Sequence, residues 1–515
     1  MKVHLMYRDQ DFSPDEPLPV NYLDLEQDLG LGTLFAAMAQ EDPFVHDVVR
    51  KGLLRSMTNV EAVLYRQHAV ADCLGSPDVV REMYRLVVET LDTRRKNWLG
   101  LFPSHPSAIV HSAVEVLRLF TQSLMNLRTF ADTDGHRFRS EGFTRFFTML
   151  QQELDDAYFA RIQEQLNHLA RPGVLVRAQL GRGHRGTNYT LVIDPPSDRH
   201  VLGRLFSRKV PGYTFHVDAR DEGGHRTLTA MEDAGLNEAA NALAQSSDHI
   251  LAFFHRLKTE LAFFVGCVNL HDQLVAKGEP WCMPEPLISD QRQRYCRGLY
   301  DMSLSLRLDG QVVGNDVEAD GADLLIVTGA NQGGKSTFLR SIGVSQLMMQ
   351  AGMFVPADAF TANLCEGLFT HFRREEDATM NSGKLDDELR RMSSMADHIT
   401  PNNLILFNES FASTNEREGA ELFRQITDAL LECHVQVVAV SHMYAYANAY
   451  YMQALSNVVF LRADRSRTFR LAPGRPLATS FGQDLYERIF HGGDRGEKLI
   501  WCERCSALRI ARPRT

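Results

Sequence analysis

The segment GANQGGKS, residues 329–336, decides the fold of this chain. It has the full spacing G-x-x-x-x-G-K-S, whose glycines let backbone N–H groups curl around phosphate oxygens. In this motif Lys335 reaches the β- and γ-phosphates, and the Ser336 hydroxyl ligates Mg²⁺. The apolar run LLIVT precedes the motif and the helical pattern STFLRSIGVSQLMMQ follows it, so the phosphates would meet a helix N-terminus. The segment therefore predicts a nucleotide site with magnesium.

Short apolar runs alternate with helical stretches from about Leu324 onward. The runs are LLIV, LILF and QVVAV. This alternation is typical of an α/β domain with a mostly parallel sheet and helices on both faces. We expect a P-loop ATPase domain over residues 286–515, with a helical C-terminal end.

Two further strand ends carry candidate chemistry. In LILFNES, residues 404–410, Glu409 could orient or deprotonate an attacking water, although an acidic residue in a plain turn is the alternative. The preceding Asn408 occupies the position where a Walker-B aspartate normally supports magnesium, and its amide supplies no negative charge. His442 follows QVVAV, and ligands bind outside the carboxyl ends of parallel strands, so it should converge with the P-loop. A structural histidine is the alternative there.

The first 170 residues are predicted to be a helical core. Asp42-Pro43 has the pattern of an N-cap followed by proline at the first helical position. Thr58 and Glu61 have the spacing of a capping box. A break near residues 132–139 divides the later helices.

The character of the chain changes at residue 171. GVLVRAQL and TNYTLVI alternate and are rich in β-branched residues, which predicts a β-hairpin. The turn between them, GRGHRG, matches G-x-G-x-x-G, but a strand follows it, so we interpret it as a basic hairpin turn. Residues 171–212 carry seven arginines and one lysine against two aspartates, a local net charge of +6. We assign residues 171–235 to a basic β-rich insert, a candidate phosphate-contacting element, and residues 236–285 to a long returning helix.

The composition of the whole chain excludes several classes of protein. Its 515 residues suggest about three domains, and 44% hydrophobic with 23% charged residues is ordinary globular usage. No apolar run approaches a membrane span, the first residues contain no secretion signal, and eight scattered cysteines indicate a reducing cytoplasm. Cys502 and Cys505 form a single C-x-x-C pair, either half a zinc site or two ordinary cysteines. The net charge of −10 argues against a chain coated in nucleic acid, but it averages over the local basic stretch.

Several segments resemble the MutS family of DNA repair ATPases. TGANQGGKSTFLRSIG is similar to the family's nucleotide-binding segment, and GNDV to the stretch before its strand. NESFASTNEREG resembles the Walker-B segment with its following loop, SHMYAYA the strand-end histidine motif, and TSFGQDLYERIF the closing helix. LYRQHAVADCL is more weakly similar to a helix of the core domain.

The resemblance implies roles for individual residues. Glu409 would polarise water and His442 would sense or position the γ-phosphate. The loop Ser413-Thr414-Asn415 would reach the partner's nucleotide across a homodimer with two composite sites. The helical region would form the family's core and levers, and the insert would lie where a DNA clamp sits. The residues expected to bind ATP and Mg²⁺ are Gly329, Ala330, Asn331, Gln332, Gly333, Gly334, Lys335, Ser336 and Thr337, with Asn408 beside them, and Ser336 as the magnesium ligand. The residues expected to contact the DNA backbone are Arg171, Arg177, Arg182, Arg185, Arg204, Arg208 and Lys209.

Some features depart from the family. The residues before the helical core contain no Phe-x-Glu, the wedge that stacks on a mispaired base, and we expect no nuclease domain after the ATPase. We therefore expect a shortened MutS-like protein that does not recognise mismatches through that wedge. Ala330 replaces the usual proline, a mild change, whereas Asn408 in place of aspartate predicts slow turnover.

Three functions remain to be separated. The first is an ATP-dependent DNA-binding protein that closes a dimeric clamp on duplex or branched DNA in repair or recombination, with further repair proteins as partners and no membrane. The second is a nucleotide-gated scaffold that hydrolyses little ATP and binds a protein, which Asn408 and the net charge of −10 favour. The third, an ABC-type ATPase outside this family, is disfavoured because the chain has no L-S-G-G-Q signature.

Overall fold

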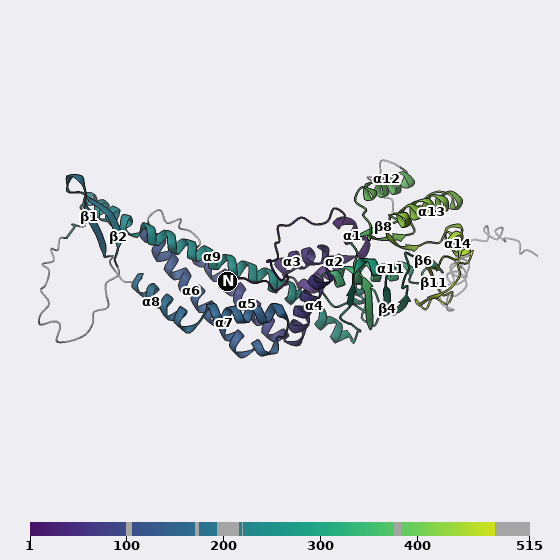
Figure 1. Ribbon diagram of the computed structural model, residues 1–515, viewed down its shortest axis with the longest axis horizontal. Helices are drawn as coiled ribbons and strands as arrows, with labels where there is room; N and C mark the ends of the chain where they lie inside the picture. Colours follow the sequence, from purple (N-terminus) through teal and green to yellow (C-terminus); the bar gives the residue numbers. More distant parts are fainter. Residues whose placement is uncertain (99–105, 170–174, 193–215, 219, 375–382, 479–515) are drawn as a thin grey trace, which may run out of the picture.

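The chain forms a long arm of helices joined at one end to a domain built on two β-sheets (Figure 1). The computed structural model describes residues 1–98, 106–169, 175–192, 216–218, 220–374 and 383–478. A small β-hairpin lies at the outer end of the arm, and the sheet domain lies at the opposite end (Figure 1). Within the described residues, no helix is long and apolar enough to cross a membrane.

The arm is organised around one helix, α9, of 56 residues. At 1.5 Å per residue this helix is about 84 Å long. It packs against α6, α5, α3 and α2 along its length. Its buried phenylalanines, such as Phe254 and Phe264, place their rings in the shared core. Among the described residues, the helices of the arm are α2 (Leu31–Ala39), α3 (Pro43–Leu54), α4 (Val60–Gly75), α5 (Pro77–Trp98), α6 (Pro106–Thr133), α7 (Glu141–Glu153), α8 (Asp156–Leu169) and α9 (Glu222–Lys277), with a 3-10 turn, η1 (Gly135–Arg137), between α6 and α7. Helix α1 (Tyr22–Leu29) packs against the sheet domain instead.

The helix caps confirm one sequence prediction and correct another. The Asp42 carboxylate accepts hydrogen bonds from the N–H groups of Phe44 (2.8 Å) and Val45 (3.2 Å), so Asp42 is the predicted N-cap of α3. For α4 the predicted cap, Thr58, is wrong. Asn59 caps this helix, and its side chain accepts from the Ala62 N–H at 3.0 Å. Asparagine is as good an N-cap as serine or threonine, and it directly precedes the first helical residue.

Helix α9 differs from its predicted bounds of 236–285. It begins at Glu222, inside the stretch assigned to the insert, and ends at Lys277, where Gly278 adopts a left-handed conformation with φ 66°. The Asp221 carboxylate caps the first turn by accepting from the Gly224 N–H at 2.9 Å. Two glycines in that turn weaken the helical pattern. The apolar periodicity of the sequence therefore predicted a start at residue 236, later than the observed start of the helix.

The hairpin at the outer end of the arm is confirmed. Strands β1 (Val176–Leu180) and β2 (Gly186–Leu191) pair antiparallel. The turn between them contains the 3-10 segment η2 (Arg182–His184), in which Gly183 has φ 68°. GRGHRG is thus a hairpin turn, and the alternative of a dinucleotide-binding loop is excluded because no helix follows it.

A six-stranded sheet forms the centre of the second domain, in the order β12-β11-β6-β10-β9-β8. All neighbours pair parallel except β12, which confirms the mostly parallel sheet. Its strands are β6 (Leu324–Gly329), β8 (Leu368–Phe372), β9 (Leu404–Asn408), β10 (Gln436–Val440), β11 (Val458–Ala463) and β12 (Leu471–Pro473). Within the part of this domain that the structure describes, the helices are α10 (Met302–Arg307), α11 (Lys335–Gln350), α12 (Lys384–Ala396), α13 (Glu416–Glu432) and α14 (Tyr444–Gln453).

Both faces of this sheet are covered. Because side chains alternate along a strand, Leu324 and Ile326 of β6 pack with α13 and α14, whereas Leu325 and Val327 face α11. The face on α11 belongs to the same continuous core that fills the arm. Helix α11 therefore connects the sheet to the arm.

A second sheet of four short strands was not anticipated from the sequence. Its order is β3-β7-β4-β5, with β3 (Glu285–Leu287), β4 (Arg294–Leu299), β5 (Asn315–Glu318) and β7 (Ala359–Asn363). These strands are only three to six residues long, and the β4–β5 register shifts between Cys296 and Leu299. Such short, irregular strands carry too little periodicity to be recognised in the sequence.

Candidate functional site

The P-loop joins the end of β6 to the start of α11, and its backbone requires glycine at two places. Gly329 has φ 109° and Gly334 has φ 87°, a region that other residues rarely adopt. A Cβ on Gly329 would lie 2.4 Å from the Ala463 carbonyl oxygen of β11. Gly334 is the N-cap residue of α11, so the helix N-terminus opens directly onto the loop.

Lys335 is held inside this loop. Its side chain is 5% exposed, and its ammonium donates to the carbonyl oxygens of Gly329 (3.1 Å) and Ala330 (3.0 Å). Burial lowers the pKa of Lys335, and the nearby Glu409 carboxylate opposes that shift. The positive charge is thus concentrated in the concavity where P-loop proteins bind phosphates.

The ends of β6 and β9 bring the other candidate residues together. The Ser336 hydroxyl donates to the Asn408 side-chain oxygen at 2.9 Å. Glu409 follows with φ 53°, and its N–H donates to the Val440 carbonyl oxygen of β10 at 2.9 Å. One cleft of about 320 Å³ is lined by Asn331, Gln332, Gly333, Gly334, Lys335, Ser336, Thr337 and Glu409. The structure therefore places Glu409 across from the P-loop.

A magnesium ion would fit this cleft only together with phosphate oxygens. Ser336 and Asn408 supply two neighbouring oxygens, and the Glu409 carboxylate lines the same cleft. Among the described residues, no three His, Cys, Asp or Glu side chains are grouped so that they could hold a metal ion. Magnesium is commonly bound by few protein oxygens, with phosphates and water completing its shell. The donor set suits an ion that arrives with a nucleotide.

His442 does not line the cleft. It is exposed, in the turn between β10 and α14. The preceding Ser441 is anchored to β6, because its N–H donates to the Val327 carbonyl oxygen at 3.1 Å. The residue thus lies at the same sheet edge as Glu409, and its contact with a γ-phosphate stays a prediction.

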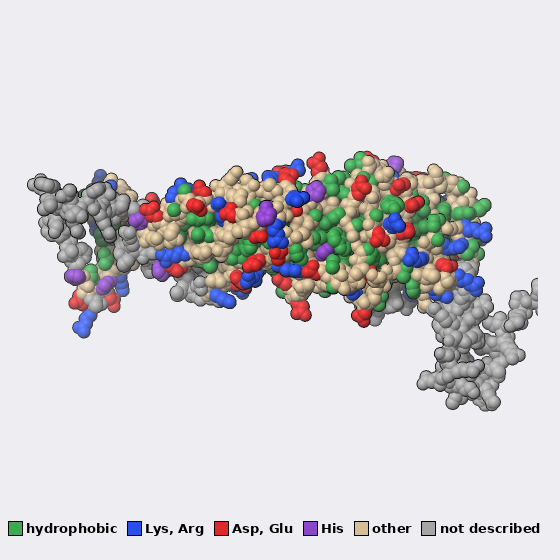
Figure 2. Space-filling model, turned by 90° about the horizontal axis from the view of Figure 1, so that it is seen from below, with side chains coloured by type: hydrophobic (Ala, Val, Ile, Leu, Met, Phe, Trp, Pro, Cys, Tyr) green, Lys and Arg blue, Asp and Glu red, His purple; other side chains and the backbone are tan. Residues whose placement is uncertain are grey.

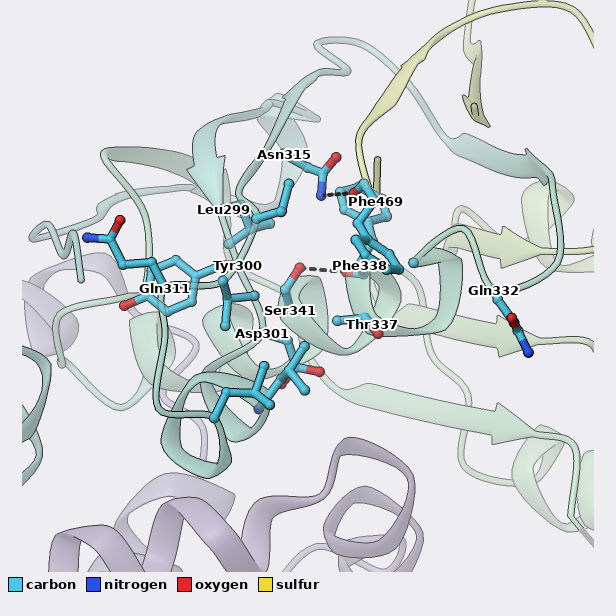
Figure 3. A pocket seen from close by; sticks show the side chains of 15 residues that line it. Leu299, Tyr300, Asp301, Gln311, Asn315, Gln332, Thr337, Phe338, Ser341 and Phe469 are labelled. Carbon is cyan, nitrogen blue, oxygen red and sulfur yellow. Dashed lines mark hydrogen bonds between the residues drawn. The ribbon is translucent and has the colours of Figure 1, made fainter. Parts of the chain in front are cut away.

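A second pocket, of about 490 Å³, adjoins the phosphate cleft and was missed in the sequence (Figure 3). It shares Gln332, Gly334 and Thr337 with the cleft. Phe469, from the loop between β11 and β12, lines it. Asn315 of β5 holds this loop in place, donating to the Phe469 carbonyl oxygen (3.2 Å) and accepting from the Leu471 N–H (2.7 Å). Asn315 lies in the GNDV stretch, so its role at the site could have been predicted from that motif. No motif in the sequence indicated a role for Phe469.

Three polar side chains of this pocket, those of Tyr300, Ser341 and Asp301, are already hydrogen-bonded. Tyr300 donates to the Pro280 carbonyl oxygen at 2.9 Å, and Ser341 donates to that of Phe338 at 2.6 Å. Asp301 accepts from the Arg340 guanidinium at 3.0 Å. Figure 3 shows these groups around aliphatic and aromatic side chains. The pocket suits a flat, largely apolar group bound by burial and stacking.

The loop expected to act across a dimer is tied to its own chain. Asn415 caps α13 by accepting from the Glu418 N–H at 3.0 Å, and Thr414 donates to the Glu418 carboxylate at 2.5 Å. Ser413 donates to the Glu388 carboxylate of α12 at 3.4 Å. A role at a partner's nucleotide stays a prediction.

The basic residues of the insert are only partly described. Arg177 in β1, and Arg182 and Arg185 at the hairpin turn, are exposed. On the face drawn in Figure 2, acidic and basic side chains are interspersed along the arm. The other residues proposed to contact DNA, Arg171, Arg204, Arg208 and Lys209, lie outside the described residues, as do the Cys502–Cys505 pair and the segment TSFGQDLYERIF.

Comparisons with known proteins agree with this architecture. The family model described as the MutS2 N-terminal domain matches residues 58–277, and the one described as MutS domain V matches residues 325–469. The chain is 30% identical over 335 residues to the endonuclease MutS2 of Lacticaseibacillus casei. The aligned region covers 58% of this chain and 40% of that protein. It is 34% identical over 118 residues to the DNA mismatch repair protein MutS of Chloroflexus aurantiacus. This alignment covers 22% of this chain and 12% of that protein.

The two matched regions correspond to the two parts of the molecule. The first contains most of the arm, including α9, and the second contains the P-loop, the Glu409 turn and the strands that position them. The chain spans about 40% of the length of the MutS2 relatives that it matches. With both domain types in this order, the chain belongs to the MutS family.

Proposed function

We propose that this chain binds ATP with Mg²⁺ in the P-loop cleft, hydrolyses it, and uses the nucleotide to control its hold on DNA. The observation that carries the proposal is the cleft of about 320 Å³, in which Lys335, Ser336 and Glu409 share one space. A structural P-loop would not need a carboxylate across from it. The names of the relatives, a DNA mismatch repair protein and an endonuclease, support a nucleic-acid partner.

The residues of the cleft divide the chemistry between them. The N–H groups at the start of α11 and the Lys335 ammonium bind phosphate oxygens. Ser336 and Asn408 would hold a magnesium ion that arrives with the nucleotide, and this ion would supply neutralisation of the phosphate charge. Glu409 orients a water and accepts its proton, an effect worth about 10²–10⁴-fold in rate. The Ser336–Asn408 contact keeps the Glu409 turn beside the loop.

The adjoining pocket of about 490 Å³ would take the nucleoside. It shares three residues with the phosphate cleft, so a nucleotide can occupy both at once. Phe469 covers Gly334 and would lie over the bound group. This placement supports a nucleotide rather than inorganic phosphate as the ligand.

The arm would act as a lever on DNA. The hairpin with Arg177, Arg182 and Arg185 lies at its outer end, far from the nucleotide (Figure 1). Contacts of arginine with the phosphate backbone position a protein on DNA without reading sequence. We propose that two copies form a homodimer in which the Ser413–Asn415 loop completes the partner's site, closed by ATP binding and reset by hydrolysis.

DNA binding with and without nucleotide tests this function. We expect ATP with Mg²⁺ to change the affinity of the full chain for matched, mismatched or four-way-junction DNA. The variant Lys335→Ala should lose both ATP binding and the nucleotide effect, while keeping basal DNA binding. If no DNA tested binds at low salt, with or without ATP, the DNA part of the proposal is wrong.

A second candidate is a nucleotide-gated scaffold that barely hydrolyses ATP. The observation in its favour is Asn408, whose neutral amide stands where a carboxylate would help to hold magnesium. Under this alternative, ATP would bind and change protein contacts, but wild-type protein would show no chemical step in a single turnover.

A further inference from the structure

A buried histidine stands directly behind the Glu409 turn. His371 of β8 is fully buried, and its Nδ1 lies 2.8 Å from the hydroxyl of Ser410, the residue after Glu409. Its Nε2 lies 3.0 Å from the Glu388 carbonyl oxygen of α12. The Ser410 hydroxyl is also 2.6 Å from the carbonyl oxygen of His371 itself. Ser410 is therefore bound to β8 through both the ring and the backbone of one residue.

The directions of these hydrogen bonds follow from the chemistry of the groups. Burial, followed by the nearby Arg391, lowers the pKa of His371 to about 4, so the ring is neutral near pH 7. A neutral imidazole has one N–H, and a carbonyl oxygen can only accept, so the hydrogen is on Nε2 and donates to Glu388. Nδ1 is then an acceptor, so the one hydrogen of the Ser410 hydroxyl is shared between Nδ1 (2.8 Å) and the His371 carbonyl oxygen (2.6 Å).

The turn that this hydroxyl anchors has an unusual backbone. Glu409 has φ 53° and Phe411 has φ 59°, so two non-glycine residues in left-handed conformations flank Ser410. Such conformations persist where surrounding contacts over-determine them. The His371 ring supplies one of these contacts by stacking on Phe411, with centroids 5.2 Å apart and 15° between the planes.

We propose that His371 is a positioning residue for ATP hydrolysis, which holds the Glu409 carboxylate at the phosphate cleft through Ser410. The proposal rests on the ATPase function proposed above. Glu409 is fixed on one side by Asn408, which is bonded to Ser336, and on the other by Ser410, which is bonded to His371. Loss of the second anchor would leave the nucleotide site intact but release the carboxylate.

Two substitutions weaken this anchor to different degrees. Ser410→Ala deletes the hydroxyl and so both of its contacts. His371→Gln deletes the ring acceptor and the stacking on Phe411, but keeps the carbonyl oxygen of residue 371 and a donor that can reach Glu388. Ser410→Thr keeps the hydroxyl and should rescue function. The matched control is Thr427→Val, which removes a buried hydroxyl that bonds Tyr446 at 3.1 Å on the α13–α14 side of the same sheet. Thermal unfolding of each variant monitors the fold.

The readout is the division of the effect between kcat and KM. With the full chain and Mg²⁺–ATP, we expect Ser410→Ala to lower kcat about 10-fold or more, because small misplacements of a catalytic group are costly. His371→Gln should also lower kcat, but by less, since the backbone contact with Ser410 remains. KM for ATP should stay near the wild-type value, and Ser410→Thr and Thr427→Val should keep wild-type kcat. The proposal is overturned if both anchor variants keep wild-type kcat, or if their loss only follows their folded fraction.

The same assay separates this proposal from the proposed function. If wild type hydrolyses ATP and Glu409→Gln does not, while the anchor variants behave as wild type, only the role of His371 is wrong. A wild-type chain that hydrolyses no ATP overturns both.

Discussion

At the scale of single residues, the contact between Ser336 and Asn408 bears on how the proposed nucleotide site would hold magnesium. The Asn408 amide oxygen accepts the Ser336 hydroxyl at 2.9 Å, so its geometry is that of a Walker-B residue. Only the charge is missing. Interactions with an ionised group are roughly twice as strong as those with a neutral one. Compared with a carboxylate at this position, the amide should therefore bind magnesium more weakly, but at the same place.

Asn408→Asp restores that charge without changing the size of the side chain. We expect the Mg²⁺ concentration for half-maximal ATPase activity to fall by about threefold to tenfold, because a neutral oxygen near the ion becomes anionic. A magnesium titration of steady-state ATPase activity measures this shift. Ser336→Ala should raise the requirement instead. An unchanged or higher requirement in Asn408→Asp would show that Asn408 does not face the ion.

At the scale of elements, helix α9 holds the N-terminal segment through one buried carboxylate. Glu260 is completely buried and accepts from the N–H groups of Leu5 (2.6 Å), Met6 (3.0 Å) and Phe12 (2.8 Å). All three donors lie in a segment without regular secondary structure. A buried N–H needs a partner, so this one side chain orders the segment against the arm.

Glu260→Ala should therefore destabilise the arm strongly. It leaves three buried N–H groups without an acceptor, and we expect a loss of at least about 3 kcal/mol in the free energy of unfolding. Chemical denaturation followed by circular dichroism measures it. The matched control is Glu238→Ala, an exposed glutamate on the same helix, which should change stability little. Similar losses in both variants would contradict the role of Glu260.

What the sequence could predict depended on the strength of each local signal. The P-loop, the three central strands and the hairpin were predictable, because glycine spacing and apolar runs are local. Thr58 was predicted as the cap of α4 in error because several residues that can cap a helix are adjacent in the sequence. The start of α9 was not predicted because the glycines near residue 223 weaken the helical pattern. His371 and Phe469 carried no signal. Their roles depend on contacts between strands and loops that are distant in the chain.

At the scale of the whole molecule, one hydrophobic core runs from the arm into the sheet domain. Arg66 of α4 lies where the two parts meet. Its guanidinium donates to the carbonyl oxygens of Met6 (3.2 Å) and Ala351 (3.3 Å), and Ala351 is the C-cap of α11. It also stacks over Phe263 of α9, 5.4 Å from the ring centroid. The far end of the P-loop helix is thus bound to the helix that extends toward the hairpin.

This junction predicts that ATP and DNA affect each other's binding. By thermodynamic linkage, the factor by which ATP changes DNA affinity must equal the factor by which DNA changes ATP affinity. Arg66→Lys, which cannot make the same paired contacts, should move this factor toward 1 while each ligand alone binds within about threefold of wild type. Fluorescence titrations of each ligand with and without the other measure the factor. A wild-type factor in a folded Arg66→Lys variant would place the coupling elsewhere.

The outer hairpin predicts a specific dependence of DNA binding on salt. Replacing Arg182 and Arg185 by glutamate should weaken DNA binding and lower the slope of affinity against salt by about one for each phosphate that the hairpin no longer neutralises. KM for ATP should not change, because the hairpin is remote from the P-loop. Arg85→Glu, an exposed arginine on α5, is the control and should keep wild-type DNA binding. Unchanged DNA affinity in the double variant would remove the hairpin from the DNA interface.

The most direct test of the central claim is single-turnover hydrolysis of ATP by the full chain, with protein in excess and Mg²⁺ present. We expect wild type to convert bound ATP in one exponential phase. Glu409→Gln should slow that phase by about 10²-fold or more, since it removes the base, while ATP binds as before. Hydrolysis by Glu409→Gln at the wild-type rate, or no hydrolysis by wild type, would contradict the assignment of the cleft as an ATPase site.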